Sequence, residues 1–108
     1  MREARMSTWQ DAVGNIWGRY ASSDTSAPTL IVGSHLDSIV NAGKYDGTLG
    51  VLLGIELCGL LAASGTDLPF NLDVVGFCDE EGVRFGATLL GSLAISGKWQ
   101  DSWAELTD

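Results

Sequence analysis

The sequence predicts an α/β fold: a three-layer α/β/α fragment with a hairpin and a β-α-β unit of a mainly parallel sheet. Two observations support this class. Short apolar runs bounded by turn residues occur at residues 12–20, 29–35 and 71–78, and such runs are typical of strands. A longer apolar stretch at residues 48–64 separates the last two runs, and its length suits a helix.

The first two strands are expected to pair with each other. Residues 12–20, AVGNIWGRY, are rich in strand formers, and a cluster of turn residues, SSDTSAP, follows them. The segment TLIVGSH at residues 29–35 is a second short apolar strand. We therefore predict a hairpin with a loose loop between these two strands.

The rest of the chain predicts helix, strand and helix. Apolar residues fall on nearly every face of a helix at residues 48–64, which favours packing between a sheet and another layer, and its glycines allow a close approach to the sheet. The segment NLDVVGFC at residues 71–78 is almost continuously apolar, as expected of a central parallel strand that is buried on both faces. Residues 87–96 are predicted to form a second helix.

Composition argues against several classes of partner. The chain has 108 residues, which suits one domain, and its net charge of −8 disfavours nucleic acid and anionic membrane surfaces. Its most apolar stretch is shorter than the roughly 20 residues of a membrane-spanning helix, and the N-terminal segment lacks the features of an export signal. Cys58 and Cys78 are far apart in sequence, which favours free thiols and a cytoplasmic location.

Polar residues follow both predicted parallel strands, at the end where ligands bind in open α/β sheets. The segment HLDSIVNAGKYDG contains the one histidine of the chain, and DEEGVRFG follows the later strand. These loops supply three candidate metal ligands, His35, Asp46 and Glu81. Imidazole and carboxylates together suit Zn²⁺ or Mn²⁺, and a carboxylate such as that of Asp46 can bridge two ions.

Spacing suggests roles for two neighbouring residues. Asp37 lies two positions after His35 on an extended segment, so its carboxylate can accept the second ring N–H of the histidine. Glu80 and Glu81 are adjacent and point apart, so one can bind metal while the other takes a proton from water. A packed histidine, a solvated acidic loop and, for Cys78, a small buried thiol are the ordinary alternatives. The coincidence of these groups at adjacent strand ends favours a hydrolytic site.

Two segments also resemble a known family. GSHLDSIVNAGKYDGTLGVLLGIE and DEEGVRFGATLLGS are similar to the N-terminal catalytic segment of the N-carbamoyl-L-amino-acid hydrolase and allantoate amidohydrolase family, a branch of the dinuclear metallo-exopeptidases. The resemblance implies two divalent metal ions, with His35 and Glu81 as ligands of different ions and Asp46 as the bridge. It also implies that Glu80 is the general base and that Asp37 is the partner of His35.

The same resemblance limits what the chain is expected to do alone. Members of that family are far longer and have two further histidine ligands, whereas this sequence has one histidine. We therefore expect residues 1–108 to be a partial catalytic domain, without the lid domain and the remainder of the catalytic domain, and to have little activity by themselves. The family also implies a cis peptide bond between Asp46 and Gly47.

The expected function of the full-length parent, a homodimer in the family, is hydrolysis of a ureido C–N bond by metal-activated water. An N-carbamoyl-L-amino acid or allantoate is the expected substrate. Two alternatives stay open: a non-catalytic structural or interaction module, and a related aminoacylase or dipeptidase. The filled ligand positions disfavour the first alternative. The peptidase branches have an aspartate, variable residue, lysine, glycine pattern at the bridging position, whereas this sequence has Asp46, Gly47 and Thr48 there, which disfavours the second. An uncovered sheet edge favours self-association, so we expect homo-oligomers.

Overall fold

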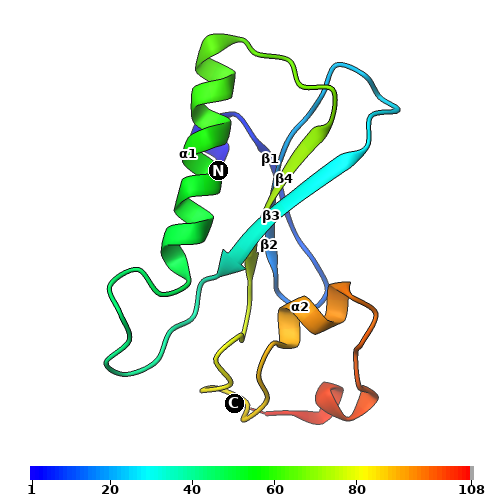
Figure 1. Cartoon of the computed structure of the whole chain (residues 1–108). Helices are drawn as coiled ribbons and strands as arrows, with labels where there is room; N and C mark the ends of the chain where they lie inside the picture. Colours follow the sequence, from blue (N-terminus) through cyan, green and yellow to red (C-terminus); the bar gives the residue numbers. More distant parts are fainter. Residues whose placement is uncertain (108) are drawn as a thin grey trace.

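The computed structural model describes residues 1–107 and contains a mixed sheet of four strands with helices beside it (Figure 1). The α/β class is confirmed. In chain order the elements are η1 (Arg2–Ala4), β1 (Ser7–Gln10), β2 (Ile16–Tyr20), β3 (Thr29–His35), α1 (Thr48–Ser64), β4 (Asn71–Phe77), α2 (Leu90–Ile95) and η2 (Asp101–Glu105).

The strand order in the sheet is β1-β2-β4-β3. β3 and β4 pair in parallel through the crossover helix α1, so the predicted β-α-β unit is confirmed. β2 pairs antiparallel with β1 on one side and with β4 on the other. The predicted pairing of residues 12–20 with residues 29–35 is therefore wrong. β4 lies between those strands because its interior is buried on both faces, and the hairpin forms instead between β2 and the polar strand β1.

A buried asparagine ties the hairpin to the segment after β4. The loop of the hairpin is held by Asp11, whose carboxylate accepts hydrogen bonds from the main chain of Asn15, from its side chain and from the Trp17 indole, each at 2.9 Å. The Asn15 side chain is fully buried; it accepts from the Cys78 N–H at 3.0 Å and donates to the Gly91 carbonyl at 3.1 Å. The start of α2 and the end of β4 are thereby fixed to β2.

Helix α1 packs closely on the sheet through small residues. It begins and ends where the sequence predicts, and its buried residues are Val51, Gly54 and Cys58. A Cβ atom at Gly54 would lie 3.0 Å from Cγ1 of Val74 in β4. The predicted close approach through glycine is therefore confirmed at this position.

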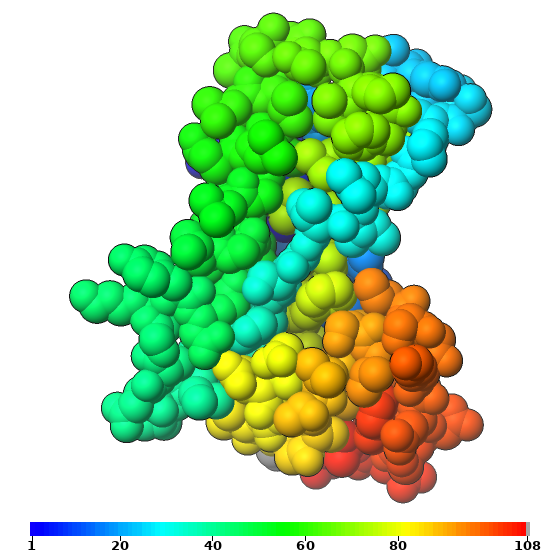
Figure 2. All heavy atoms as spheres, viewed as in Figure 1, coloured from blue at the N-terminus to red at the C-terminus, as the bar shows by residue number. Residues whose placement is uncertain are grey.

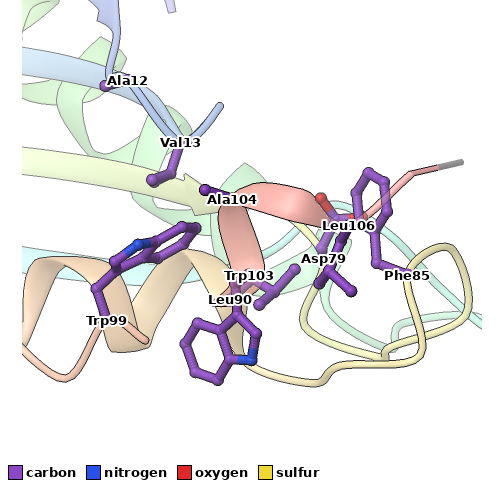
Figure 3. A pocket seen from close by; sticks show the side chains of 9 residues that line it. All are labelled: Ala12, Val13, Asp79, Phe85, Leu90, Trp99, Trp103, Ala104 and Leu106. Carbon is purple, nitrogen blue, oxygen red and sulfur yellow. The ribbon is translucent and has the colours of Figure 1, made fainter. Parts of the chain in front are cut away.

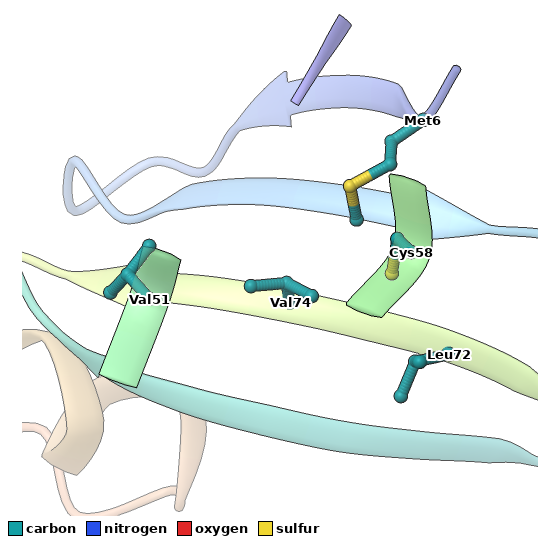
Figure 4. Close-up of a cluster of buried hydrophobic side chains, with 5 residues drawn as sticks. All are labelled: Met6, Val51, Cys58, Leu72 and Val74. Atoms are coloured by element: carbon teal, nitrogen blue, oxygen red, sulfur yellow. The ribbon is translucent and has the colours of Figure 1, made fainter. Parts of the chain in front are cut away.

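The core lies between α1, the sheet and the N-terminal segment (Figure 4). Its buried members are Met6, Val51, Cys58, Leu72 and Val74. The opposite face of α1 has five leucines that are between 38% and 61% exposed: Leu49, Leu52, Leu53, Leu57 and Leu60. Figure 2 shows this face of the helix uncovered. Within residues 1–107 the helix is therefore packed on one side only.

Helix α2 is shorter than the predicted residues 87–96. Gly86 and Leu89 both have left-handed φ angles, 68° and 61°, so the chain turns before the helix starts at Leu90. Among the described residues, no helix has the length and apolar character needed to cross a bilayer.

Candidate metal centre

The parallel register of β3 and β4 brings the two polar loops together. His35 at the end of β3 is paired with Phe77 at the end of β4, and the N–H of Leu36 donates to the Phe77 carbonyl at 3.2 Å. Both strands therefore end at the same edge of the sheet, as predicted. The loop that leads to α1 and the loop that follows β4 both leave from this edge.

The three predicted metal ligands converge at that edge. One ligand atom from each of His35, Asp46 and Glu81 lies within 4.8 Å of the others. They come from the end of β3, the turn before α1 and the loop after β4. His35 Nε2 lies 3.5 Å from a carboxylate oxygen of Asp46. An imidazole and two carboxylates within this distance form a donor set that suits a divalent cation such as Zn²⁺ or Mn²⁺.

The main chain sets the orientation of the histidine. His35 Nδ1 lies 2.9 Å from the main-chain oxygen of Asp37. Because a carbonyl oxygen can only accept a hydrogen bond, Nδ1 has the proton and donates it. The lone pair of Nε2 is then available on the side of Asp46 and Glu80, whose oxygens lie 3.5 Å and 3.8 Å away. This is the tautomer that a metal ligand needs.

The Asp37 carboxylate has a different set of partners from the one that spacing suggests. Its nearer oxygen is 3.7 Å from His35 Nδ1, which is longer than a hydrogen bond. Its two oxygens instead accept the main-chain N–H groups of Glu80 at 3.1 Å and Glu81 at 2.9 Å. Sequence reasoning missed these contacts, because main-chain donors have no sequence signature.

Gly47 lies against the imidazole ring. A Cβ atom at this position would be 2.4 Å from two ring atoms of His35, so glycine is required for the ring to occupy its place. Its φ angle of 73° also turns the chain into α1. The peptide bond from Asp46 to Gly47 is trans, so the cis bond implied by the resemblance is wrong. The left-handed glycine makes the turn that presents Asp46 without it.

The electrostatics of the centre favour a cation. Loss of surrounding water, and then the nearby charges of Asp46 and Glu80, raise the pKa of Glu81, and His35 partly opposes this. A carboxylate crowded by other negative charges in this way is stabilised in its charged form by a positive charge placed nearby. The residues of the centre therefore fit the divalent ions that the resemblance implies.

Cys78 lies outside the group of metal donors. Its thiol donates to the Val13 carbonyl at 2.9 Å. Burial, followed by the charges of Asp79 and Asp11, raises the pKa of Cys78 to about 11. The thiol is therefore protonated at neutral pH and poorly suited to bind a metal.

The tryptophans pack as pairs. Trp9 and Trp17 are stacked with ring centroids 5.6 Å apart, and Trp99 and Trp103 meet edge to face at 5.4 Å. The second pair lines a cavity of about 310 Å³ whose wall also contains Asp79 (Figure 3). In both pairs the rings pack against each other in geometries that aromatic side chains favour.

The chain is similar to several proteins that are named as hydrolases. The profile of peptidase family M28 matches residues 15–105. The allantoate deiminase of Arabidopsis thaliana is 43% identical over 110 residues, and the N-carbamoyl-L-amino acid amidohydrolase of Geobacillus stearothermophilus is 43% identical over 97 residues. A crystal structure of a hydantoinase/carbamoylase family amidase from Burkholderia ambifaria superposes with a TM-score of 0.91 at 36% identity and covers 99% of this chain.

The chain spans about a quarter of the length of these proteins. The alignment with the Arabidopsis protein covers 100% of this chain and 21% of the relative, and the alignment with the Geobacillus protein covers 90% and 24%. The superposition with the Burkholderia amidase covers 26% of that chain. The matched stretch includes both loops of the candidate centre.

Proposed function

The chain belongs to peptidase family M28, and from this membership we propose that it is a partial catalytic domain of a metal-dependent amidohydrolase. The proposed reaction is hydrolysis of a C–N bond in a ureido group or another linear amide that is not a peptide bond. Relatives named allantoate deiminase, N-carbamoyl-L-amino acid amidohydrolase and ureidoglycolate hydrolase support this substrate class.

The observation that carries the proposal is the convergence of His35, Asp46 and Glu81 within 4.8 Å. Three donors from separate segments meet at the edge of the sheet where ligands bind in α/β folds. A module without catalytic function has no reason to keep two carboxylates and an imidazole so close, because their mutual repulsion and desolvation cost stability.

The chain's own residues have defined tasks in this proposal. His35 and Glu81 would each be a ligand of one metal ion, and Asp46 would be a ligand shared by both. When bound, such ions supply Lewis-acid polarisation of a carbonyl oxygen and a water of lowered pKa. The Glu80 carboxylate takes a proton from the attacking water and passes it to the leaving nitrogen. Its distance of 3.8 Å from the His35 ring supports this position at the margin of the ligand set.

The proposed partners are a small ureido or carbamoyl substrate and a second copy of the full-length protein. We place the protein in the cytoplasm, where free thiols such as Cys58 and Cys78 persist. The 108-residue chain alone is expected to show no turnover, because substrate contacts and further ligands are proposed to come from other segments.

A chimera tests the function. The chain replaces the matching segment of the Geobacillus stearothermophilus amidohydrolase, and the product is assayed with Zn²⁺ or Mn²⁺ on N-carbamoyl-L-amino acids, allantoate and ureidoglycolate. We expect turnover of at least one substrate. The Glu80→Gln substitution should lower kcat at least about 100-fold, since general base catalysis contributes this much. Glu56→Gln, at an exposed carboxylate on α1, is the matched control and should leave kcat unchanged.

Further substrates decide between the alternatives. Turnover restricted to acylated amino acids or dipeptides would favour an aminoacylase or dipeptidase. A chimera that folds and binds metal but hydrolyses none of these substrates would contradict the proposed function. In that case the non-catalytic alternative would gain support.

A further inference from the structure

We propose that the Asp37 side chain is a positioning residue that fixes the main chain of Glu80 and Glu81, and so places both carboxylates at the candidate metal centre. One carboxylate oxygen accepts the Glu80 N–H at 3.1 Å and the other accepts the Glu81 N–H at 2.9 Å. Hydrogen bonds to an ionised acceptor are stronger than neutral ones. The inference rests on the function proposed above, because it assigns a task within the same site.

The geometry separates this task from orientation of the histidine. The ring N–H of His35 donates to the main-chain oxygen of Asp37, at 2.9 Å, whereas the carboxylate lies 3.7 Å from the same nitrogen. The main chain of Asp37 therefore holds the imidazole, and the side chain of the same residue holds the loop after β4. A single residue thus couples the metal donor of β3 to the donors that follow β4.

The segment of Glu80 is held from the other side as well. Its carbonyl accepts the N–H of Leu89 at 2.8 Å, and the Asp79 carbonyl accepts the N–H of Leu90 at 3.2 Å. Asp79 has a left-handed φ of 47°, which reverses the chain directly after β4. Two consecutive N–H groups then meet one carboxylate. Without that carboxylate, the N–H groups of Glu80 and Glu81 lose the hydrogen bonds that hold this segment near His35.

The Asp37→Asn substitution tests the inference in the metal-free chain. The amide keeps the size of the carboxylate but offers one acceptor oxygen, and its NH₂ group faces an N–H donor. We expect the Glu80 or Glu81 N–H to exchange with solvent at least about tenfold faster by NMR, since a hydrogen-bonded closed state is lost. The imidazole nitrogen signals of His35 should stay those of the Nδ1-protonated ring.

Metal binding supplies a second readout. Calorimetric titration with Zn²⁺ should show affinity reduced by about 10- to 100-fold in the Asp37→Asn chain, as is typical when a residue that supports metal ligands is changed. Ser38→Ala, at the adjacent position, is the matched control and should alter neither the Glu80 and Glu81 exchange rates nor Zn²⁺ affinity.

Several outcomes would overturn the inference. If the substitution changes the imidazole signals of His35 and leaves both N–H groups protected, Asp37 acts through the histidine instead. If the variant does not fold, the unsubstituted chain still tests the inference. Glu80 and Glu81 N–H groups that exchange as fast as that of the exposed Gly43 would show that the Asp37 carboxylate does not hold them. Failure of the unsubstituted chain to bind Zn²⁺ would count against the proposed function alone, since the exchange measurement needs no metal.

Discussion

At the scale of single residues, one glycine and one aspartate shape the candidate centre and the loop beside it. Gly47 leaves room for the His35 ring, and its positive φ is a conformation that other residues adopt at a cost of roughly 1 to 3 kcal/mol. Asp11 organises the hairpin loop that Asn15 connects to the end of β4. Each of these positions supports a prediction.

The Gly47→Ala substitution should weaken metal binding at least about tenfold, equivalent to about 1.4 kcal/mol. The new Cβ atom would lie 2.4 Å from the His35 ring, so the ring or the turn must move. Calorimetric titration with Zn²⁺ measures the effect. Gly43→Ala is the control, because a Cβ atom there has no heavy atom within 4 Å. Equal affinities of the two variants would contradict the prediction.

Asp11 should make stability depend on pH in the acid range. Burial acts to raise the pKa of Asp11, but hydrogen bonds from Trp17, Asn15 and Val13 outweigh it and hold the pKa below the ordinary value of 3.8. A carboxyl group whose pKa is lowered by folding stabilises the fold above its unfolded pKa. That contribution disappears as pH falls through the lower, folded value.

We therefore expect Asp11→Asn to reduce the free energy of unfolding by about 2 kcal/mol at pH 7, with the difference shrinking below about pH 4. Urea unfolding followed by circular dichroism at several pH values measures this. The exposed Asp101→Asn variant is the control and should match the unsubstituted chain. A difference that is constant from pH 7 to pH 3 would refute the assignment.

At the scale of elements, the spacing between α1 and the sheet depends on which glycine faces β4. At Gly54 a Cβ atom would lie 3.0 Å from the buried Val74 side chain, whereas at Gly59 the nearest neighbour is the Ala4 Cβ at 3.6 Å. Alanine is favoured over glycine within a helix by about 1 kcal/mol. Gly59→Ala should therefore raise the melting temperature, and Gly54→Ala should not. Thermal unfolding by calorimetry distinguishes the two, and an equal rise in both would show that α1 can move away from the sheet.

The elements also show where sequence reasoning succeeds. Helix α1 and strand β4 have long, uniform apolar patterns, so both were predicted within one residue of their observed ends. Strand β1 is short and polar, and its sequence has no local signal for pairing with β2. The predicted pairing of β2 with β3 is wrong for a related reason. Strand order depends on which strand is buried on both faces, and this strand is β4. Asp73 is buried in β4 and forms an ion pair with Arg19 of β2. This pair supports the pairing of β2 with β4 only once the register is known.

The candidate centre follows the same division. His35, Asp46 and Glu81 could be predicted because strand ends collect polar loops, and the structure brings them together. The partners of the Asp37 carboxylate and the trans bond before Gly47 depend on main-chain geometry, which local sequence does not specify.

At the scale of the whole molecule, exposed apolar surface should dominate behaviour in solution. The five leucines on the outer face of α1 and the outer edge of β3 are both uncovered within residues 1–107. We expect the chain to form concentration-dependent oligomers in sedimentation experiments, because such surfaces associate. The double variant Leu53→Gln and Leu60→Gln should shift the population toward monomer. Val83→Gln, at a loop residue that is 66% exposed, should not. A monomer at high concentration for the unsubstituted chain would contradict this expectation.

β4 is the last strand along residues 1–107 but lies in the interior of the sheet, between β2 and β3. During synthesis β2 and β3 leave the ribosome before the strand that both must pair with exists. Of the three strand pairings, that of β1 with β2 joins the residues closest in sequence, so it can form before β4 exists. The four-stranded sheet, and the edge that gathers His35, Asp46 and Glu81, can therefore form only after β4 and the loop that follows it have been made.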